Sequence, residues 1–292
     1  MKRICLLDNP KSGSRAHADR VKELLNRMEA CGFEVFCEEL ISLEQTQQVI
    51  AAQIDAGCDM FIVSGGDGTV SSVSHHLTGT RIPLLIFPAG NENLLATHLG
   101  LQPIPSKAID AIRQGKYRDI DVAQVNDILC IAMVGVGVDA AIVHHVHRMR
   151  KGHINKSHYI WAAIKTFLRY NHTEISIRID GEEVFCNKAF AIIGNIPGYG
   201  GGFKIFKEAV CDDGLLNVTV FQCSTIFQLI YLFTLVVVGQ MDKSSLIHYY
   251  KGQKIEIVSA VSTMQSQIDG DSGPALPLNI QVVPAGLRLL VP

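Results

Sequence analysis

A glycine-rich segment, Ser64-Gly65-Gly66-Asp67-Gly68-Thr69, follows an apolar run at residues 60–63 and precedes apolar residues at helical spacing. The apolar run is typical of a buried strand in a parallel sheet. A strand, a glycine-rich turn and a helix N-terminus together present backbone N–H groups to an anion, and glycine lets a phosphate approach closely. Asp67 would repel a phosphate unless it binds a metal ion or a hydroxyl group. The segment therefore indicates either a nucleotide-phosphate site with magnesium or a tight turn capped by Asp67.

Two further polar turns follow predicted strands. The run at 3–7 leads into the turn at 9–14, and the run at 83–87 leads into the turn at 88–93. Another strand is expected at 33–37, and helices are expected at 16–30, 49–56, 69–77 and 106–114. Strands that alternate with helices predict a doubly wound parallel sheet, which binds ligands at the carboxyl ends of its strands. Because the three turns should open on that same edge, together they favour a nucleotide site.

The second half of the chain has a different pattern. Strand-like runs without regular intervening helices occur at 117–125, 128–134, 175–179, 189–193, 215–221 and 254–258. This pattern predicts an antiparallel sheet or sandwich, and we place the domain boundary near Val122. Helical insertions are expected around 138–169 and 226–238. We interpret 226–238 as a core helix of the second domain, with a lipid-facing surface as the alternative.

Length and composition limit the class of protein. The chain has 292 residues, enough for two domains, and its 48% hydrophobic and 18% charged residues are typical of a globular protein. A formal net charge of -2 gives no overall attraction to nucleic acid, so no nucleic-acid partner is expected. Eight scattered cysteines without paired metal spacing predict reduced thiols. The apolar runs are too short for a signal peptide or for the roughly 20 residues of a membrane span, which predicts a cytoplasmic location.

The stretch between Asp139 and Glu174 contains no acidic residue. Its basic residues are Arg148, Arg150, Lys151, Lys156, Lys165 and Arg169, and it includes six histidines. Each Lys or Arg near an anionic membrane is worth about 1 kcal/mol, so the stretch is a candidate for peripheral docking. The alternative is a solvated helical face over an apolar underside. Metal binding by the neighbouring histidines 144, 145 and 147 is disfavoured, because they diverge on a helix and no carboxylate or cysteine joins them.

Further polar motifs lie in the second half. Residues 194–202 form a dense glycine-rich loop, and two turns carry carboxylates, Asp212-Asp213-Gly214 and Asp269-Gly270-Asp271. Asp119 and Asp121 lie near the predicted domain boundary. Carboxylates at turns that face a phosphate site suit magnesium-assisted phosphoryl transfer, and plain Asp-Gly turns are the alternative.

Together these motifs resemble the diacylglycerol kinase and bacterial lipid kinase family, which also includes sphingosine and ceramide kinases. The resemblance extends from Asn9-Pro10 to residues 282–292. The Gly-Gly-Asp-Gly-Thr motif at 65–69 is shared with NAD kinases and phosphofructokinases, whereas the glycine-rich loop, Asp213-Gly214-Leu215-Leu216 and Asp269-Gly270-Asp271 are specific. The resemblance implies an α/β nucleotide-binding domain at 1–122, completed by a last strand at about 286–292. It also implies a C-terminal β-sandwich lipid domain at 123–285.

The resemblance also implies site residues. The nucleotide-binding set is Asn9, Lys11, Ser12, Gly65, Gly66, Asp67, Gly68, Thr69, Gly90 and Asn93. Asp213 and, through water, Asp121 are implied as Mg²⁺ ligands. Asp271 occupies the position of the general base, and Asp67 is the second catalytic residue. Three positions depart from the family: Asp271 replaces glutamate, Asn91 replaces threonine and Lys207 replaces proline.

We therefore expect a Mg²⁺-dependent kinase that transfers the γ-phosphoryl group of ATP to a hydroxyl of a diacylglycerol-like or other long-chain lipid. Its partner would be lipid at a membrane surface, so the cytoplasmic protein would be peripherally membrane-associated. A second copy of the chain, in a homodimer, is the candidate protein partner. One alternative is a catalytically weak nucleotide- or lipid-binding regulator on the same fold, which Asp271 and Asn91 favour. The other is a NAD-kinase-like enzyme with a soluble acceptor, which the glycine-rich loop and the C-terminal motif disfavour.

Overall fold

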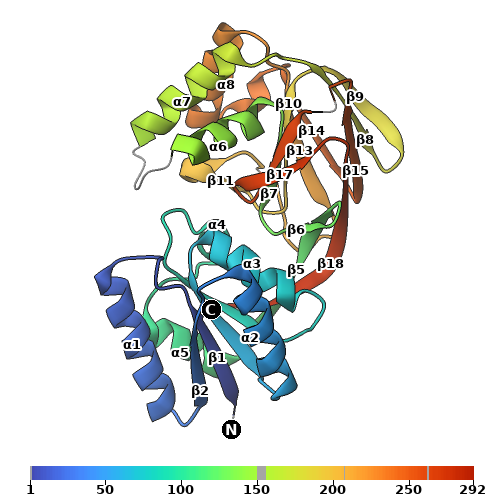
Figure 1. Ribbon diagram of the computed structural model, residues 1–292. Coiled ribbons are helices and arrows are strands. Elements are labelled where there is room, and N and C mark those ends of the chain that lie inside the picture. The colour runs from blue at the N-terminus through green and yellow to red at the C-terminus, as the bar shows by residue number, and fades with distance from the viewer. Residues whose placement is uncertain (1, 150–155, 207, 262) are drawn as a thin grey trace. The chain divides into compact units, whose positions relative to one another are not determined.

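The chain folds into two compact units (Figure 1). A computed structural model describes residues 2–149, 156–206, 208–261 and 263–292. Unit 1 comprises Met1–Asp121 and Pro284–Pro292, and unit 2 comprises Val122–Val283. Strands β5 (Tyr117–Val125) and β18 (Leu278–Leu290) contribute residues to both units.

Unit 1 alternates strands and helices. Its strands are β1 (Arg3–Asp8), β2 (Glu34–Glu39), β3 (Met60–Gly65) and β4 (Leu84–Pro88). Its helices are α1 (Arg15–Ala30), α2 (Leu43–Asp55), α3 (Asp67–Leu77), α4 (Leu94–His98) and α5 (Pro105–Gln114). The strands run parallel in the order β2-β1-β3-β4, and β18 joins β4 in parallel by pairing Leu289 with Leu84. The predicted doubly wound parallel sheet and the returning last strand are thus confirmed.

The core of unit 1 explains why its strands read as continuous apolar runs. Every residue of β3 is buried, as expected for a central parallel strand covered on both faces. On one face, Leu24 and Met28 of α1 and Ile109 of α5 pack against Leu6 and Ile62 of the sheet. Figure 1 shows α2 and α3 on the other face. Burial of each large side chain contributes about 1.5–3 kcal/mol, which fixes the strand ends that carry the polar turns.

Unit 2 is mainly antiparallel. Its further strands are β6 (Ile128–Cys130), β7 (Met133–Val136), β8 (Glu174–Ile179), β9 (Glu182–Lys188), β10 (Phe190–Gly194), β11 (Gly198–Tyr199), β12 (Phe203–Lys204), β13 (Leu216–Phe221), β14 (Ile247–Gly252), β15 (Lys254–Ser259), β16 (Gln265–Ile268) and β17 (Asp271–Ala275). Its helices are α6 (Val138–Met149), α7 (Lys156–Arg169) and α8 (Ile226–Val238), with short 3-10 turns at Gly200–Gly202 and Met241–Lys243.

Two sheets of unit 2 share one core. One runs in the order β14-β13-β10-β7-β16-β17, and the other contains β18-β15-β8-β9. Ile193 and Val218 from the first sheet pack in one cluster with Ile177 and Ile257 from the second. This arrangement confirms the predicted β-sandwich. Figure 1 shows α6, α7 and α8 gathered together beside these sheets.

The interpretation of 226–238 as a core helix is wrong. The segment is helical, with a capping box formed by Thr225 and Gln228, but Leu232 is its one buried residue. Phe227 is 81% exposed, and most of its other apolar side chains are also accessible. Burial of an apolar run cannot be read from hydropathy alone, because a helix that is apolar all round lacks a polar face to mark the solvent side. Among the described residues, no helix is long and apolar enough to cross a membrane.

Candidate active site

The three polar turns of unit 1 lie side by side at the carboxyl edge of the parallel sheet. Strands β1, β3 and β4 are neighbours, so their ends carry the turns to one place. The Asn9 N–H donates to the carbonyl oxygen of Ser64 at 2.9 Å, and its side-chain amide donates to Thr69 Oγ1 at 2.8 Å. The Ala89 N–H donates to the carbonyl oxygen of Gly65 at 2.8 Å. Backbone and side-chain hydrogen bonds thus join the three turns.

Asp67 connects the second turn to the third. Its Oδ2 accepts the N–H of Asn93 at 2.9 Å, and its Oδ1 accepts the N–H of Leu94 at 2.7 Å. These donors open α4, so the carboxylate caps a helix that is distant in sequence. Asn93 adopts the left-handed conformation, with φ of 47°, and both its side-chain oxygen and its amide bond to Gly90. Asp67 therefore positions the turn that contains two of the predicted nucleotide-binding residues.

Two glycines allow the second and third turns to approach each other. A Cβ atom added to Gly90 would lie 2.7 Å from the Cα of Gly66, which is closer than real contacts allow. A Cβ added to Gly66 would lie 3.3 Å from the Cα of Gly90. Because both neighbours are backbone atoms, neither can rotate away. Glycine at these positions therefore serves the close approach of two main chains.

This contact makes a testable difference between the two glycines. Gly90→Ala should destabilise unit 1 by about 1–3 kcal/mol and weaken ATP binding at least about tenfold, because the turns must separate. Gly66→Ala, with its longer contact, should cost less in both respects. Urea unfolding and nucleotide titration of the two variants would check this order. A Gly90→Ala protein that matches the wild type in stability and ATP affinity would show that the two turns do not form one binding site.

Some supporting residues were missed by the sequence reasoning. His17 is buried in α1, with its Nε2 atom 2.9 Å from Ser64 Oγ, beneath the first two turns. Burial lowers the pKa of His17, which favours the neutral ring. Gly13 has φ of +87°, and an added Cβ would meet His17 at 2.9 Å. In the same turn, the N–H groups of Lys11 and Ser12 donate to Asn9. These three implied nucleotide-binding residues therefore form one folded loop.

The two aspartates of β5 hold the returning strand. Asp121 is buried, and its Oδ1 accepts the N–H of Ala285 at 2.9 Å. Asp119 binds Arg288 through two hydrogen bonds of 2.7 and 2.9 Å, and the Arg288 guanidinium lowers the pKa of Asp119. Both aspartates thus fasten β5 to the part of β18 that belongs to unit 1. The proposed water-mediated metal role of Asp121 would come in addition to this structural contact.

The other implied site residues belong to unit 2. Asp213 is exposed, and its Oδ1 accepts the N–H of Leu215 at 3.0 Å, which closes an Asx turn. Asp271 is the exposed first residue of β17 and pairs with Ile268 across the turn from β16. Lys207, one of the departures from the family, lies outside the described residues.

Two more carboxylates of unit 2 have roles that sequence reasoning did not assign. The Asp269 carboxylate accepts the N–H groups of Ile131, Ala132 and Met133 at 2.8–3.0 Å, so it ties the Asp-Gly-Asp turn to the start of β7. Asp139 is buried at the start of α6 and bonds to the hydroxyl of Tyr199 and the amide of Gln267. Burial raises the pKa of Asp139. Including the thiol of Cys130, Asp269 bonds to residues up to 139 positions away, and only flanking glycines hinted at these contacts.

The donor set limits how Mg²⁺ could bind. Within the described ranges, no group of three or more His, Cys, Asp or Glu side chains could hold a metal by itself. Mg²⁺ that acts with ATP usually takes one or two carboxylates, with phosphates and water as its other ligands. The exposed Asp213 fits this chemistry, because its Oδ2 has no hydrogen-bond partner among the described residues. The residues present thus fit a metal that arrives with the nucleotide.

The fold and the linked turns define a class: an α/β unit with polar turns at the carboxyl edge of a parallel sheet, followed by a β-sandwich unit. A family model for the diacylglycerol kinase catalytic domain matches residues 3–125, and one for the YegS C-terminal NAD kinase beta sandwich-like domain matches residues 132–291. The chain belongs to the diacylglycerol kinase family. It is accordingly a member of a kinase family, for which ATP is the implied co-substrate.

Individual relatives agree with this assignment. The chain is 29% identical over 310 residues to a diacylglycerol kinase of Mycobacterium tuberculosis strain H37Rv, covering 99% of this chain and 95% of the relative. It is 25% identical over 281 residues to a diacylglycerol kinase of Bacillus subtilis strain 168, covering 95% and 92%. A crystal structure of a diacylglycerol kinase from Bacillus anthracis strain Sterne has a TM-score of 0.77 at 22% identity, covering 100% and 97%. That structure shows the same fold.

Proposed function

We propose that this protein is a Mg²⁺-dependent lipid kinase that phosphorylates a hydroxyl of a diacylglycerol-like or other long-chain lipid. The observation that supports ATP binding is a cradle formed by the three linked turns. In this cradle Asp67 caps α4, and two glycines bring main chains together. The glycine-rich turn leads into the N-terminus of α3, and such a helix N-terminus suits the phosphates of ATP. Lys11, on the first turn, adds a positive charge for the same phosphates.

The proposed transfer uses a small number of side chains. Asp271 takes the proton of the acceptor hydroxyl while that oxygen attacks the γ-phosphorus, and the bond to the β–γ bridging oxygen breaks to release ADP. Asp213 is the proposed protein ligand of Mg²⁺, and Asp121 acts through water. Bound Mg²⁺ neutralises charge on the phosphates. Most of the acceleration would come from positioning and charge stabilisation, as in other phosphoryl transfers.

An exposed apolar surface on α7 and α8 supports the proposal that the protein acts on a lipid at a membrane. The side chains of this α7/α8 surface are Trp161, Ile164, Leu168, Phe227, Ile230, Tyr231, Phe233, Val237 and Val238, each 42–81% exposed. The two helices lie in contact, as Figure 1 shows. Lys165 places its ammonium group 4.8 Å from the centre of the Trp161 ring. Apolar side chains beside cations suit peripheral docking on an anionic membrane, which we propose for this protein in the cytoplasm.

Docking can be tested by separating its apolar and electrostatic parts. Phe227→Ser should weaken binding to vesicles of anionic phospholipid by roughly tenfold or more, since a buried Phe contributes about 1.5–3 kcal/mol. Lys165→Glu with Arg169→Glu should also weaken binding, and only this loss should fade as salt rises. Ile41→Ser, at a site of unit 1 that is 68% exposed, is the control. Co-sedimentation that ignores both α7/α8 variants would remove the docking proposal. Arg150 and Lys151 of the basic stretch lie outside the described residues.

The enzyme proposal is tested by an assay with radiolabelled ATP on a panel of lipid micelles, with the product identified by mass spectrometry. A phosphorylated lipid that requires Mg²⁺ supports the kinase. Binding of ATP without turnover on any lipid would instead favour the regulator, for which Asp271 and Asn91 are the motivating departures. Phosphorylation of a soluble acceptor such as NAD would favour the NAD-kinase-like alternative. Sedimentation of the same preparation would test the homodimer.

A further inference from the structure

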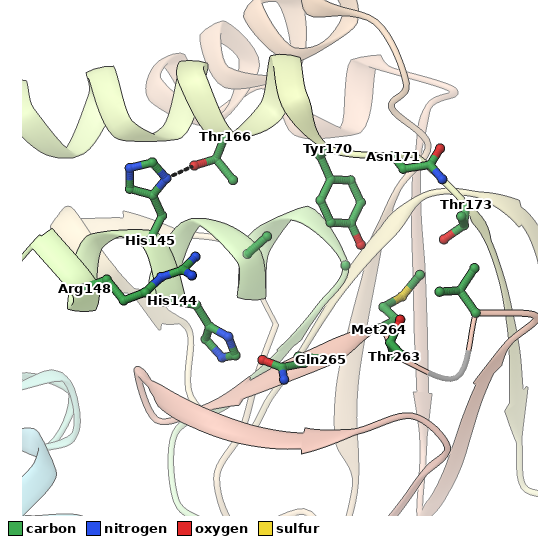
Figure 2. A pocket seen from close by; sticks show the side chains of 13 residues that line it. His144, His145, Arg148, Thr166, Tyr170, Asn171, Thr173, Thr263, Met264 and Gln265 are labelled. Carbon is green, nitrogen blue, oxygen red and sulfur yellow. Dashed lines mark hydrogen bonds between the residues drawn. The ribbon is translucent and has the colours of Figure 1, made fainter.

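A cavity of about 350 Å³ lies within unit 2, between α6, α7 and the segment that enters β16 (Figure 2). Its volume falls within the range of about 300–1,000 Å³ that small-molecule sites occupy. None of the residues assigned above to the nucleotide, the metal or the general base lines it. The cavity is therefore separate from the proposed catalytic residues.

One end of the cavity has a guanidinium group and two imidazole rings. Figure 2 shows Arg148, His144 and His145 together at this end. His144 Nε2 lies 3.0 Å from the carbonyl oxygen of Ser266, which can only accept, so this nitrogen carries a hydrogen. His145 Nδ1 lies 3.0 Å from Thr166 Oγ1. These contacts fix the orientation of both rings beside the guanidinium group.

The same end lacks negative charge. No Asp or Glu is among the lining residues, and the sequence between Asp139 and Glu174 contains none. Arg148 makes no ion pair with a described residue. An unpaired guanidinium beside two imidazoles and a hydroxyl is a typical environment for a phosphate group.

The other end is neutral and carries hydroxyl and amide groups. Tyr170, Asn171 and Thr173 come from the segment that follows α7, opposite Thr263 (Figure 2). Thr173 Oγ1 is buried without a hydrogen-bond partner among the described residues. Burial raises the pKa of Tyr170, so its hydroxyl is protonated at neutral pH. These groups could bond to the hydroxyls of a ligand whose phosphate lies at Arg148.

We propose that this cavity binds the phosphate ester of a small polyol, such as glycerol phosphate, with the phosphate at Arg148 and the polyol at Thr173. The ester could be free or could be the head group of an anionic phospholipid. The acceptor lipid proposed above has an uncharged hydroxyl head and does not match a cationic pocket. This binding site goes beyond the kinase function and does not rest on it, because binding is measured without turnover.

The soluble arm of the test is calorimetric titration of the full chain with glycerol 3-phosphate and with inorganic phosphate. Arg148→Ala should weaken glycerol 3-phosphate binding about tenfold or more, since it removes a charge-assisted bond. Ala141→Phe fills the cavity without a change in charge and should weaken it at least as much. Thr173→Val should weaken glycerol 3-phosphate but not inorganic phosphate. Arg178→Ala, which alters an exposed cation of β8 outside the lining, is the matched control.

Two results of the titrations would overturn the assignment. Equal losses from Arg148→Ala and Arg178→Ala, with no effect of Ala141→Phe, would indicate binding to surface charge alone. Equal affinity for inorganic phosphate and glycerol 3-phosphate would remove the polyol from the proposal. Should Ala141→Phe fail to fold, as judged by circular dichroism, Arg148→Ala and Thr173→Val still decide both points.

The vesicle arm identifies the source of the ester. Wild-type and Ala141→Phe proteins would be compared on vesicles of phosphatidylcholine with and without phosphatidylglycerol. A loss of phosphatidylglycerol-dependent binding in Ala141→Phe indicates that the occupant is a lipid head group. A loss confined to soluble glycerol 3-phosphate indicates a free ester. No loss in either arm overturns the site.

Discussion

Asp67→Asn should lower the turnover with ATP and the best lipid acceptor at least about 100-fold. The reason is geometric, because both oxygens of Asp67 accept N–H groups that open α4. Asparagine keeps one acceptor and turns an amide toward the other N–H, so the third turn must shift. A displacement of about 1 Å can cost on the order of 100-fold in rate. Steady-state kinetics would measure the loss.

The same change should also reduce stability, by about 1–3 kcal/mol, because a charged acceptor is lost from two backbone donors. Urea unfolding followed by circular dichroism would measure this loss and would show that the variant still folds. Asp19→Asn, at an exposed carboxylate of α1, is the control and should change neither quantity. A folded Asp67→Asn protein with near-normal turnover would remove Asp67 and the cradle from the proposed site.

Asp271→Asn should reduce kcat by roughly 10²–10⁴-fold, the usual contribution of a general base. ATP affinity should remain nearly unchanged, because the group acts on the acceptor hydroxyl. Asp271→Glu should be tolerated, since glutamate is the residue that the family resemblance implies at this position. Its longer side chain would raise the rate if the carboxylate of Asp271 falls short of the hydroxyl. Kinetics with varied lipid and varied ATP would separate the two effects.

Glu256→Gln tests whether loss of any exposed carboxylate of unit 2 has the same effect, and it should leave kcat unchanged. Full activity of Asp271→Asn would exclude Asp271 as the base. Asp67, whose oxygens already accept two N–H groups, would then be the leading candidate for the general base.

Much of the fold was predictable because local patterns and tertiary structure agree. The run 60–63 became the centre of β3, and Val70, Val73 and Leu77 pack as the helical spacing predicts. The closing strand was expected from the family resemblance, and the pairing of Leu289 with Leu84 confirms its return. Helix α4 was not expected, because its five residues are too few to show a helical period and Asp67 supplies the cap from 26 positions away.

The residues around the predicted motifs were harder to find. Glycine-rich turns have a local signature, so the positions of the three turns could be read directly. The hydrogen bond between Asp139 and Gln267 joins residues 128 positions apart. The three hydrogen bonds that Asp269 accepts from the main chain at the start of β7 join residues still further apart. A single sequence contains no periodicity that reports such contacts. The prediction that α8 is a buried core helix was wrong for a different reason, because hydropathy does not distinguish a buried helix from an exposed one.

The path of β18 has a consequence for synthesis. This strand completes the sheet of unit 1 beside β4, yet it follows all of unit 2 in the chain. A ribosome that adds about 5–20 residues per second needs on the order of 10–30 s to make the intervening segment. During that interval the nascent first unit has β4 without its later neighbour, an open edge of the kind that pairs with other chains. The half of the protein that is made first is therefore finished last.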